Sequence, residues 1–157
     1  MPTITPNLWF DTEALDAAEF YVSIFPNSRI TTVTHYTEAG PGEPGTVLTV
    51  DFELDGQPYT GINGGPAFTF SEAISLLVNC RDQAEVDRYW DALLDGGEPS
   101  QCGWLKDRYG LSWQVCPVGM NEMINDPDPG RRDRAMTAML GMIKLDLAAM
   151  RAAADGA

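Results

Sequence analysis

The sequence predicts an α+β fold of two similar β-α-β-β-β modules, related by pseudo-two-fold symmetry and followed by C-terminal helices. The main observation is an apolar stripe that occurs twice, with a constant offset of 69 residues (for example, 86 − 17). Each copy has the i, i+3, i+4, i+7, i+8 spacing that places apolar side chains on one face of a helix. The copies are Ala17, Phe20, Tyr21, Ile24 and Phe25, and Val86, Tyr89, Trp90, Leu93 and Leu94. A constant offset at all five positions indicates an internal duplication.

The first module is predicted over residues 4–64 and begins with a strand over residues 4–10. Pro6 restricts this strand to the edge of a sheet or stands at its start, because proline has no backbone N–H. Thr12 is placed to cap the helix that carries the first stripe. That helix must end near Phe25, because the next residue is a proline, which cannot continue it.

Three further strands complete the first module, over residues 29–36, 46–54 and 58–63. The earliest of them alternates in polarity and is rich in β-branched residues, which is typical of a strand. Residues 38–45 contain three glycines and two prolines and therefore predict a loop. The dipeptide Asp55-Gly56 is a strong signal for a hairpin turn.

The second module is predicted over residues 74–117 and repeats this order with a shorter hairpin. Its strands are expected over residues 74–78, 100–105 and 111–116, the last two joined by a turn at 107–110. Asp82 and Glu85 have the spacing of a capping box, which predicts the start of a helix. The pair Gly96-Gly97 predicts its end.

Residues 118–157 form a C-terminal helical appendage outside the repeat. Pro129 suits the first turn of a helix, and Gly141 is placed to bend it. The apolar residues of this segment are Met136, Met139, Leu140, Ile143, Leu147 and Met150. Two interpretations stay open: the segment packs on the adjacent sheet, or its adaptable methionines form a dimer contact.

Composition and charge limit the classes of partner that the protein can bind. At 157 residues the chain suits a single domain, predicted over residues 1–157. Ten basic residues against 23 acidic ones give a net charge of −13, which repels nucleic acid and anionic membrane surfaces. No apolar run approaches the roughly 18 residues of a membrane span. Neither a nucleic acid nor a membrane is therefore expected as a partner.

The cysteines and the first residues suggest a compartment. Cys80, Cys102 and Cys116 are odd in number and show no CxxC spacing, which favours reduced thiols over a disulfide framework or a zinc site. The first residues lack the basic and apolar regions of a secretion signal. We therefore expect the protein in the cytoplasm.

Several segments resemble one family closely. They read ITPNLWFD at 4–11, FYVSIFP at 20–26, NGGPAF at 63–68, VDRYW at 86–90 and QCGWLKDRYGLSWQ at 101–114. These segments resemble the PhnB-like group of the vicinal oxygen chelate superfamily, which includes glyoxalase, bleomycin-resistance proteins and extradiol dioxygenases. The group often carries the label of a demethylubiquinone methyltransferase domain. The resemblance implies the fold of that superfamily and covers nearly the whole chain.

The resemblance also implies where a metal would be held. Metal-dependent members place one ligand on the first and one on the last strand of each module. The matching positions here are Thr5 or Asn7, Thr60, Ser75 and Gln114. Of these only Gln114 is a credible ligand, and one neutral amide cannot hold a divalent ion against water. We therefore expect no metal and no other cofactor.

The aromatic strands predict a binding site. Aromatic side chains that point into a cleft between the modules would line an apolar pocket, with a few polar groups orienting the ligand. The candidate ligand-binding residues are Asn7, Trp9, Asn63, Gln101, Trp104 and Gln114. Cys102 is a weak candidate for a catalytic nucleophile, since no Cys-His spacing supports it. The single histidine, His35, is expected to be a surface or half-buried strand residue.

Two functions follow from this pattern. The first is a metal-free protein that binds a small aromatic or amphipathic molecule. The alternative is an enzyme of the superfamily type, a lyase, a dioxygenase or the labelled methyltransferase, which uses an unlocated metal or Cys102. The resemblance also implies a homodimer, to which Arg131, Arg132 and Arg134 could contribute at the rim of the interface.

Overall fold

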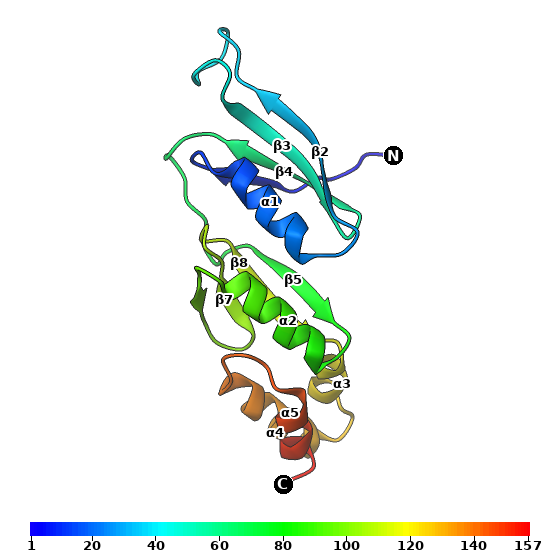
Figure 1. Ribbon diagram of the computed structural model, residues 1–157. Coiled ribbons are helices and arrows are strands. Elements are labelled where there is room, and N and C mark those ends of the chain that lie inside the picture. Colours follow the sequence, from blue (N-terminus) through cyan, green and yellow to red (C-terminus); the bar gives the residue numbers. More distant parts are fainter. The chain divides into compact units, whose positions relative to one another are not determined.

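The computed structural model describes residues 1–157 as two compact units, Met1–Phe70 and Ser71–Ala157 (Figure 1). The boundary lies in the connection expected between the two modules, and the C-terminal helices belong to the second unit. None of the helices is both long enough and apolar enough to cross a membrane. The expectation that the whole chain acts as one domain stays a prediction.

The first unit has the predicted β-α-β-β-β order. Its elements are β1 (Asn7–Phe10), α1 (Ala14–Ile24), β2 (Arg29–His35), β3 (Val47–Leu54) and β4 (Gln57–Asn63). They form one four-stranded mixed sheet of order β1-β4-β3-β2, in which β1 is parallel to β4 and the other pairs are antiparallel. Strand β1 lies at the edge and begins directly after Pro6, so that both positions allowed for this proline are realised. Asp55 and Gly56 have φ angles of 47° and 78°, which confirms the predicted tight turn.

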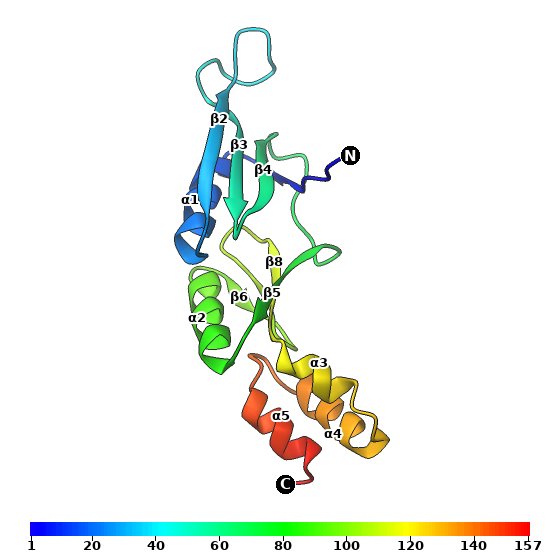
Figure 2. The ribbon, with the colours of Figure 1, turned by 90° about the vertical axis from the view of Figure 1, so that its right-hand side faces the viewer.

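Helix α1 covers one face of this sheet and leaves the other free of helices (Figure 2). The apolar stripe faces β3, where the rings of Tyr21 and Phe52 lie 6.2 Å apart and both are almost fully buried. Because side chains alternate along a strand, the residues next to Phe52 point to the helix-free face. His35, at the end of β2, is exposed as expected.

The second unit repeats the arrangement. Its elements are β5 (Ser75–Cys80), α2 (Gln83–Leu94), β6 (Glu98–Pro99), β7 (Trp104–Lys106) and β8 (Ser112–Pro117). The strand order is β5-β8-β7-β6, which corresponds strand for strand to the first sheet, and β5 is again parallel to β8. The apolar stripe of α2 is buried at Val86, Tyr89, Trp90 and Leu93. Each unit therefore contains one copy of the predicted module, which confirms the repeat.

One predicted strand differs from the structure. Residues 100–105 do not form a continuous strand, because a turn interrupts them. In that turn Cys102 and Gly103 have φ angles of 58° and 82°, in the left-handed region rather than the extended conformation of a regular strand. The result is a short β6 before the turn and a short β7 after it.

The predicted cap of α2 is confirmed, whereas the predicted cap of α1 is not. Asp82 caps α2 as predicted, since its Oδ1 accepts a hydrogen bond of 2.9 Å from the backbone N–H of Glu85. The predicted cap of α1 by Thr12 is wrong. Helix α1 starts one residue later than that cap would require, and its N-cap residue, Glu13, makes no capping hydrogen bond with its side chain.

The C-terminal appendage contains α3 (Gly119–Ile124), α4 (Pro129–Leu140) and α5 (Leu147–Ala154). Pro129 occupies the first turn of α4, as predicted, and the structure adds Asp128 as its N-cap. Gly141 ends α4 rather than bending one longer helix. The helices share a small apolar core, formed by Met123, Ala135, Leu147, Met150 and Ala154.

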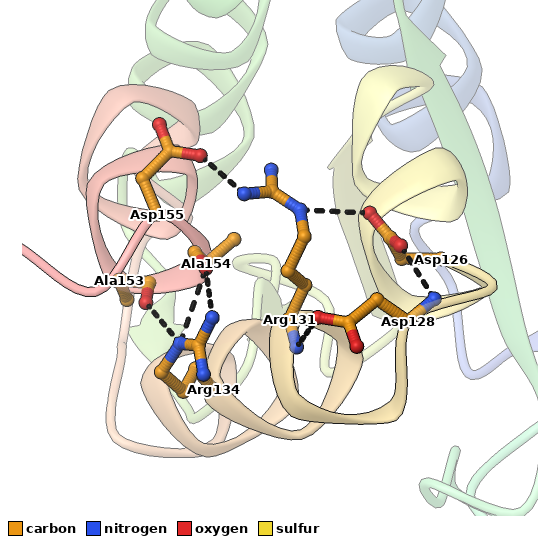
Figure 3. Close-up of polar contacts among 7 residues, drawn as sticks. All are labelled: Asp126, Asp128, Arg131, Arg134, Ala153, Ala154 and Asp155. Atoms are coloured by element: carbon orange, nitrogen blue, oxygen red, sulfur yellow. Dashed lines mark hydrogen bonds and ion pairs between the residues drawn. The ribbon is translucent and has the colours of Figure 1, made fainter.

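Charged contacts join the ends of these helices. Figure 3 shows the guanidinium of Arg131 between two carboxylates: its Nε donates to Asp126 at 3.1 Å and its Nη1 to Asp155 at 2.6 Å. Arg134 donates to the carbonyl oxygens of Ala153 and Ala154 at the C-terminal end of α5 (Figure 3). A cation at this end also interacts favourably with the helix dipole.

Contacts with α2 and with the turn before β7 attach the appendage to the rest of the second unit, and Lys144 adds an ion pair of 2.8 Å with Asp87 of α2. The Gln83 side chain, at the start of α2, donates to the Leu145 carbonyl at 2.9 Å and accepts from the Leu147 N–H at 2.8 Å. The backbone N–H groups of Cys102 and Gly103 donate to the carbonyls of residues 142 and 143. The segment therefore packs beside α2 and the turn before β7 rather than across the sheet.

Candidate functional site

The helix-free face of the second sheet carries a polar row that crosses all its strands. In the strand register Ser75 pairs with Ser112, Ser112 with Lys106, and Lys106 with Glu98. Paired residues point to the same side of a sheet. Their neighbours in sequence, such as Trp113 and Leu105, point to α2 and are buried. We call the four paired residues the polar row.

The adjacent row on this face is more apolar. Gln114 pairs with both Leu77 and Trp104. Leu77 is 52% exposed, which is high for a leucine in the middle of a strand, and Trp104 is half-buried. The Nε2 of Gln114 donates to the Oγ of Ser75 at 2.9 Å, so that the amide is held against the sheet. We call Leu77, Gln114 and Trp104 the apolar row.

A small pocket of about 140 Å³ opens where the polar row meets Trp104. Its charged and polar side chains include Glu72, Glu98, Lys106 and Ser112. The Nζ of Lys106 lies 2.6 Å from Oε1 of Glu72. This hydrogen bond raises the pKa of Lys106 and lowers the pKa of Glu72, so that both groups are held in their charged forms.

The helix-free face of the first sheet carries Asn7, Trp9 and Thr60. Asn7 is exposed and pairs with Thr60, whose hydroxyl donates to the Asp51 carboxylate at 2.6 Å. The Nε1 of Trp9 donates to the carbonyl of Gly65 at 2.9 Å. The predicted residues Asn7 and Trp9 thus lie on one face, as Trp104 and Gln114 do in the second unit.

Asn63 and Gln101 lie in different surroundings. Asn63 is almost fully buried on the α1 side of its sheet, where its Oδ1 accepts from the N–H of Ala14 and its Nδ2 donates to the carbonyl of Val47. Gln101 is exposed in the turn before β7. The structure therefore does not place these two side chains on the sheet face with the other candidates.

A larger cleft of about 630 Å³ lies in the first unit, between the β2–β3 loop and the connection after β4. Tyr36 and Asn63 line it, and the hydroxyl of Tyr36 donates to the Asn63 carbonyl at 2.6 Å. Its acidic side chains, Asp11 and Glu43, are both exposed. This cleft contains none of the other predicted ligand-binding residues.

The thiols do not form a reactive site in the sheets. Cys80 and Cys116 are buried, and burial is the main cause that raises their pKa values to about 12 and about 11. Cys102 is half-buried, and its Sγ lies 3.8 Å from the carbonyl oxygen of Leu140. A carbonyl oxygen cannot take a proton from a thiol at neutral pH, so this contact does not activate Cys102 as a nucleophile.

The positions implied for a metal do not fit a divalent ion. Thr60 donates to Asp51, and Gln114 donates to Ser75, so these side chains are used within the sheets. No group of three or more His, Cys, Asp or Glu side chains is arranged to hold a metal ion. Hydroxyl and amide groups without such partners do not bind the divalent metals of the superfamily.

Some residues of this region were missed by reasoning from the sequence. Lys106 and Ser112 lie within the quoted segment 101–114, but only the strand register shows that they are neighbours, and Glu72 joins them through its ion pair with Lys106. Asp107 is buried and accepts from the N–H groups of residues 109 and 111 and from the indole of Trp113. Asp107 could have been found from the sequence only because it lies in the segment 101–114 that resembles the PhnB-like group.

Comparison with known proteins supports this architecture. Residues 2–116 match the family described as 3-demethylubiquinone-9 3-methyltransferase. A structure described as a putative 3-demethylubiquinone-9 3-methyltransferase, PhnB protein, from Bacillus cereus is 36% identical. It aligns over 74% of this chain and 100% of its own, with a TM-score of 0.68. A comparison with curated proteins gives no match.

More distant structures share the fold alone. The protein PA1353 from Pseudomonas aeruginosa is 18% identical over 74% of this chain and 98% of its own, with a TM-score of 0.62. A mutant of the fosfomycin resistance protein FosX from Listeria monocytogenes was solved with Mn(II) and a dihydroxypropylphosphonic acid. It is 11% identical over 77% of this chain and 98% of its own, with a TM-score of 0.50.

Proposed function

The chain belongs to the family described as 3-demethylubiquinone-9 3-methyltransferase, a PhnB-like family with the vicinal oxygen chelate fold, and from this we propose that it binds a small aromatic or amphipathic molecule without a metal. The binding surface in this proposal is the helix-free face that carries Leu77, Gln114 and Trp104. The observation that carries the proposal is the apolar row beside the polar pocket on this face.

The composition of this face suits a ligand with an apolar body. An exposed leucine and a half-buried tryptophan leave apolar surface in contact with water, and covering it with a ligand is favourable. The polar row supplies the few hydrogen-bonding groups that orient a ligand in such sites. On the opposite face of the same sheet, the side chains of α2 already bury the apolar surface.

The metal-free part of the proposal rests on the donor set. The two positions on the last strands, Thr60 and Gln114, are a hydroxyl and an amide, each already hydrogen-bonded within its sheet. The related FosX structure was solved with Mn(II), but at 11% identity it shares only the fold with this chain.

The alternative is an enzyme, whether a lyase, a dioxygenase or the methyltransferase of the family description. A methyltransferase of the nucleotide-binding type uses a doubly wound parallel sheet with a glycine-rich first turn, and both sheets here are mixed and four-stranded. Cys102 is the thiol that an enzyme would use, and its Sγ contacts a carbonyl oxygen rather than a base. Both observations favour binding over catalysis.

We also propose a homodimer through the C-terminal segment. Leu140, the last residue of α4, and Ile143, in the loop before α5, are 58% and 55% exposed. Arg131 and Arg134, which the sequence offered for the rim of an interface, are instead engaged within the chain. The exposed apolar residues at the end of α4 and in the loop after it are therefore the contact that we propose, with the exposed Arg132 as the arginine left for its rim.

Binding is tested by titrating the intact protein with small neutral aromatic compounds, followed by tryptophan fluorescence and calorimetry. Trp104→Ala should weaken binding about fivefold or more, equivalent to roughly 1 kcal/mol, if stacking contributes as aromatic pairs usually do. Leu77→Ala should also weaken it. Val118→Ala is the matched control, because Val118 is similarly exposed at 47% but lies outside the sheet. Equal affinities for all variants would reject this face as the site.

A further inference from the structure

We propose that the pocket beside Ser112 binds the uncharged hydroxyl group of a small phenolic compound whose ring covers Leu77 and Trp104. This inference rests on the proposed function, because it assigns the polar end of a ligand on the same sheet face. It adds the chemical class of the ligand, which the binding surface alone does not define.

The first observation is the hydroxyl of Ser112. Ser112 is only 1% exposed, and its Oγ makes no hydrogen bond with any other group of the protein. Its place in the polar row, between Ser75 and Lys106, directs the side chain to the helix-free face, where it lines the pocket. Buried hydroxyls are almost always hydrogen-bonded, because losing water without gaining a partner is unfavourable. This hydroxyl is therefore free to donate one hydrogen bond to a ligand and to accept others.

The second observation is the charge around the pocket. Glu72 and Glu98 supply two carboxylates against the single ammonium of Lys106, which is already paired with Glu72 at 2.6 Å. This excess of negative charge disfavours an anionic ligand such as a carboxylate. An uncharged hydroxyl satisfies both kinds of neighbour, since its oxygen accepts from Ser112 while its hydrogen is donated to a carboxylate.

The third observation is the size and spacing of the site. The pocket holds about 140 Å³, close to the volume of one aromatic ring and below the roughly 300 Å³ of the smaller ligand sites, so that it takes one end of a bicyclic ligand while the rest lies outside it. Ser112 and Gln114 are two residues apart on β8, so the polar and apolar rows are separated by about 7 Å. A bicyclic aromatic compound spans that distance, with its hydroxyl in the pocket and its ring on Leu77 and Trp104.

The experiment compares naphthol with methylnaphthalene, which has a similar shape but no hydroxyl, and with the anion naphthoate, by calorimetry on the full chain. Ser112→Ala removes the hydroxyl without adding volume. It should lower the affinity for naphthol about five- to tenfold and leave the affinity for methylnaphthalene unchanged. Ser23→Ala, at an exposed serine of α1 in the other unit, is the control and should change neither. The wild type should bind naphthol more tightly than naphthoate.

A stability measurement separates binding from a structural role. Because Ser112 loses no partner, Ser112→Ala should not lower the thermal midpoint of the unliganded protein. The inference is overturned if Ser112→Ala binds naphthol with the affinity of the wild type, or if its affinities for naphthol and methylnaphthalene fall by the same factor. It is also overturned if the wild type binds naphthoate more tightly than naphthol. If the wild type binds neither naphthol nor methylnaphthalene, the proposed function fails and this inference fails with it.

Discussion

The side-chain Oδ1 of Asn63, at the end of β4, accepts a hydrogen bond of 2.8 Å from the backbone N–H of Ala14, at the start of α1. This contact joins residues 49 positions apart in the sequence. It takes the place of a local cap, because Glu13 makes no side-chain capping bond. The end of the sheet therefore satisfies one of the N–H groups that every helix leaves free at its start.

Replacing Asn63 should destabilise the first unit. Asn63→Ala leaves the buried N–H of Ala14 without its acceptor, and we expect a loss of about 2 kcal/mol in the free energy of unfolding. Urea denaturation followed by circular dichroism measures it. Asn125→Ala is the control, since Asn125 is exposed and should cost less than about 0.5 kcal/mol. Equal losses for both variants would contradict the capping role.

Gly64 should not tolerate a side chain. A Cβ at this position would lie 2.2 Å from Cζ2 of Trp9, so that Gly64→Ala must displace the indole. We expect a loss of roughly 1–3 kcal/mol and a shift of the tryptophan emission spectrum. In Gly141→Ala the nearest atom lies at 3.6 Å, which is ordinary contact, and stability should be nearly unchanged. An unshifted spectrum in Gly64→Ala would show that the indole does not pack here.

The Arg131 contacts predict a dependence of stability on pH. The backbone N–H of Asp128 and the Arg131 guanidinium lower the pKa of Asp126 below its ordinary value of 3.8. A lowered pKa stabilises the fold above the unfolded pKa, and this contribution is lost as the pH falls through the folded value. Arg131→Ala should therefore lower the thermal midpoint at pH 7, with a smaller effect well below pH 3.8. A difference that does not change with pH would exclude the charge contribution.

The thiols should react in a defined order. Burial raises the pKa of Cys80 to about 12 and of Cys116 to about 11, so that few of these groups are thiolates at pH 8. Iodoacetamide should therefore modify the native protein first at Cys102, which is the least buried of the three. Mass spectrometry of peptides identifies the site, and Cys102→Ser should abolish the early modification. Early labelling of Cys80 or Cys116 would contradict their burial.

The proposed homodimer predicts a dimer mass in light scattering at micromolar concentration. The net charge of −13 opposes association, but physiological salt screens it over about 8 Å, so that apolar burial can dominate at short range. Replacing both Leu140 and Ile143 by Asp should give a monomer. Ile4→Asp, at a residue that is 90% exposed in the first unit, is the control and should remain dimeric. A monomeric wild type would reject the dimer.

The sequence by itself determined the repeated modules. The two stripes at a constant offset specify the helices, and Asp55-Gly56 specifies a turn, because helix periodicity and left-handed turn conformations depend on neighbouring residues. The cap at Asp82 and the helix start at Pro129 were predictable for the same reason. The turn at Cys102 was not predictable from the sequence. The N–H groups of residues 102 and 103 bond to the carbonyls of residues 142 and 143, which are about 40 positions away and give no local signal.

Only the tertiary structure decided which candidate residues share a surface. Asn7, Trp9, Trp104 and Gln114 lie on helix-free sheet faces, whereas Asn63 points to a helix and Gln101 lies in a turn. Ser112 lies in the quoted segment 101–114, but that segment does not indicate the face to which its side chain points. Its burial beside Lys106 follows from the pairing of β7 with β8, and a shift of one residue in that register would turn the side chain to the other face. Local sequence sets the period of an element, but the face that each residue presents is fixed by the strand with which it pairs.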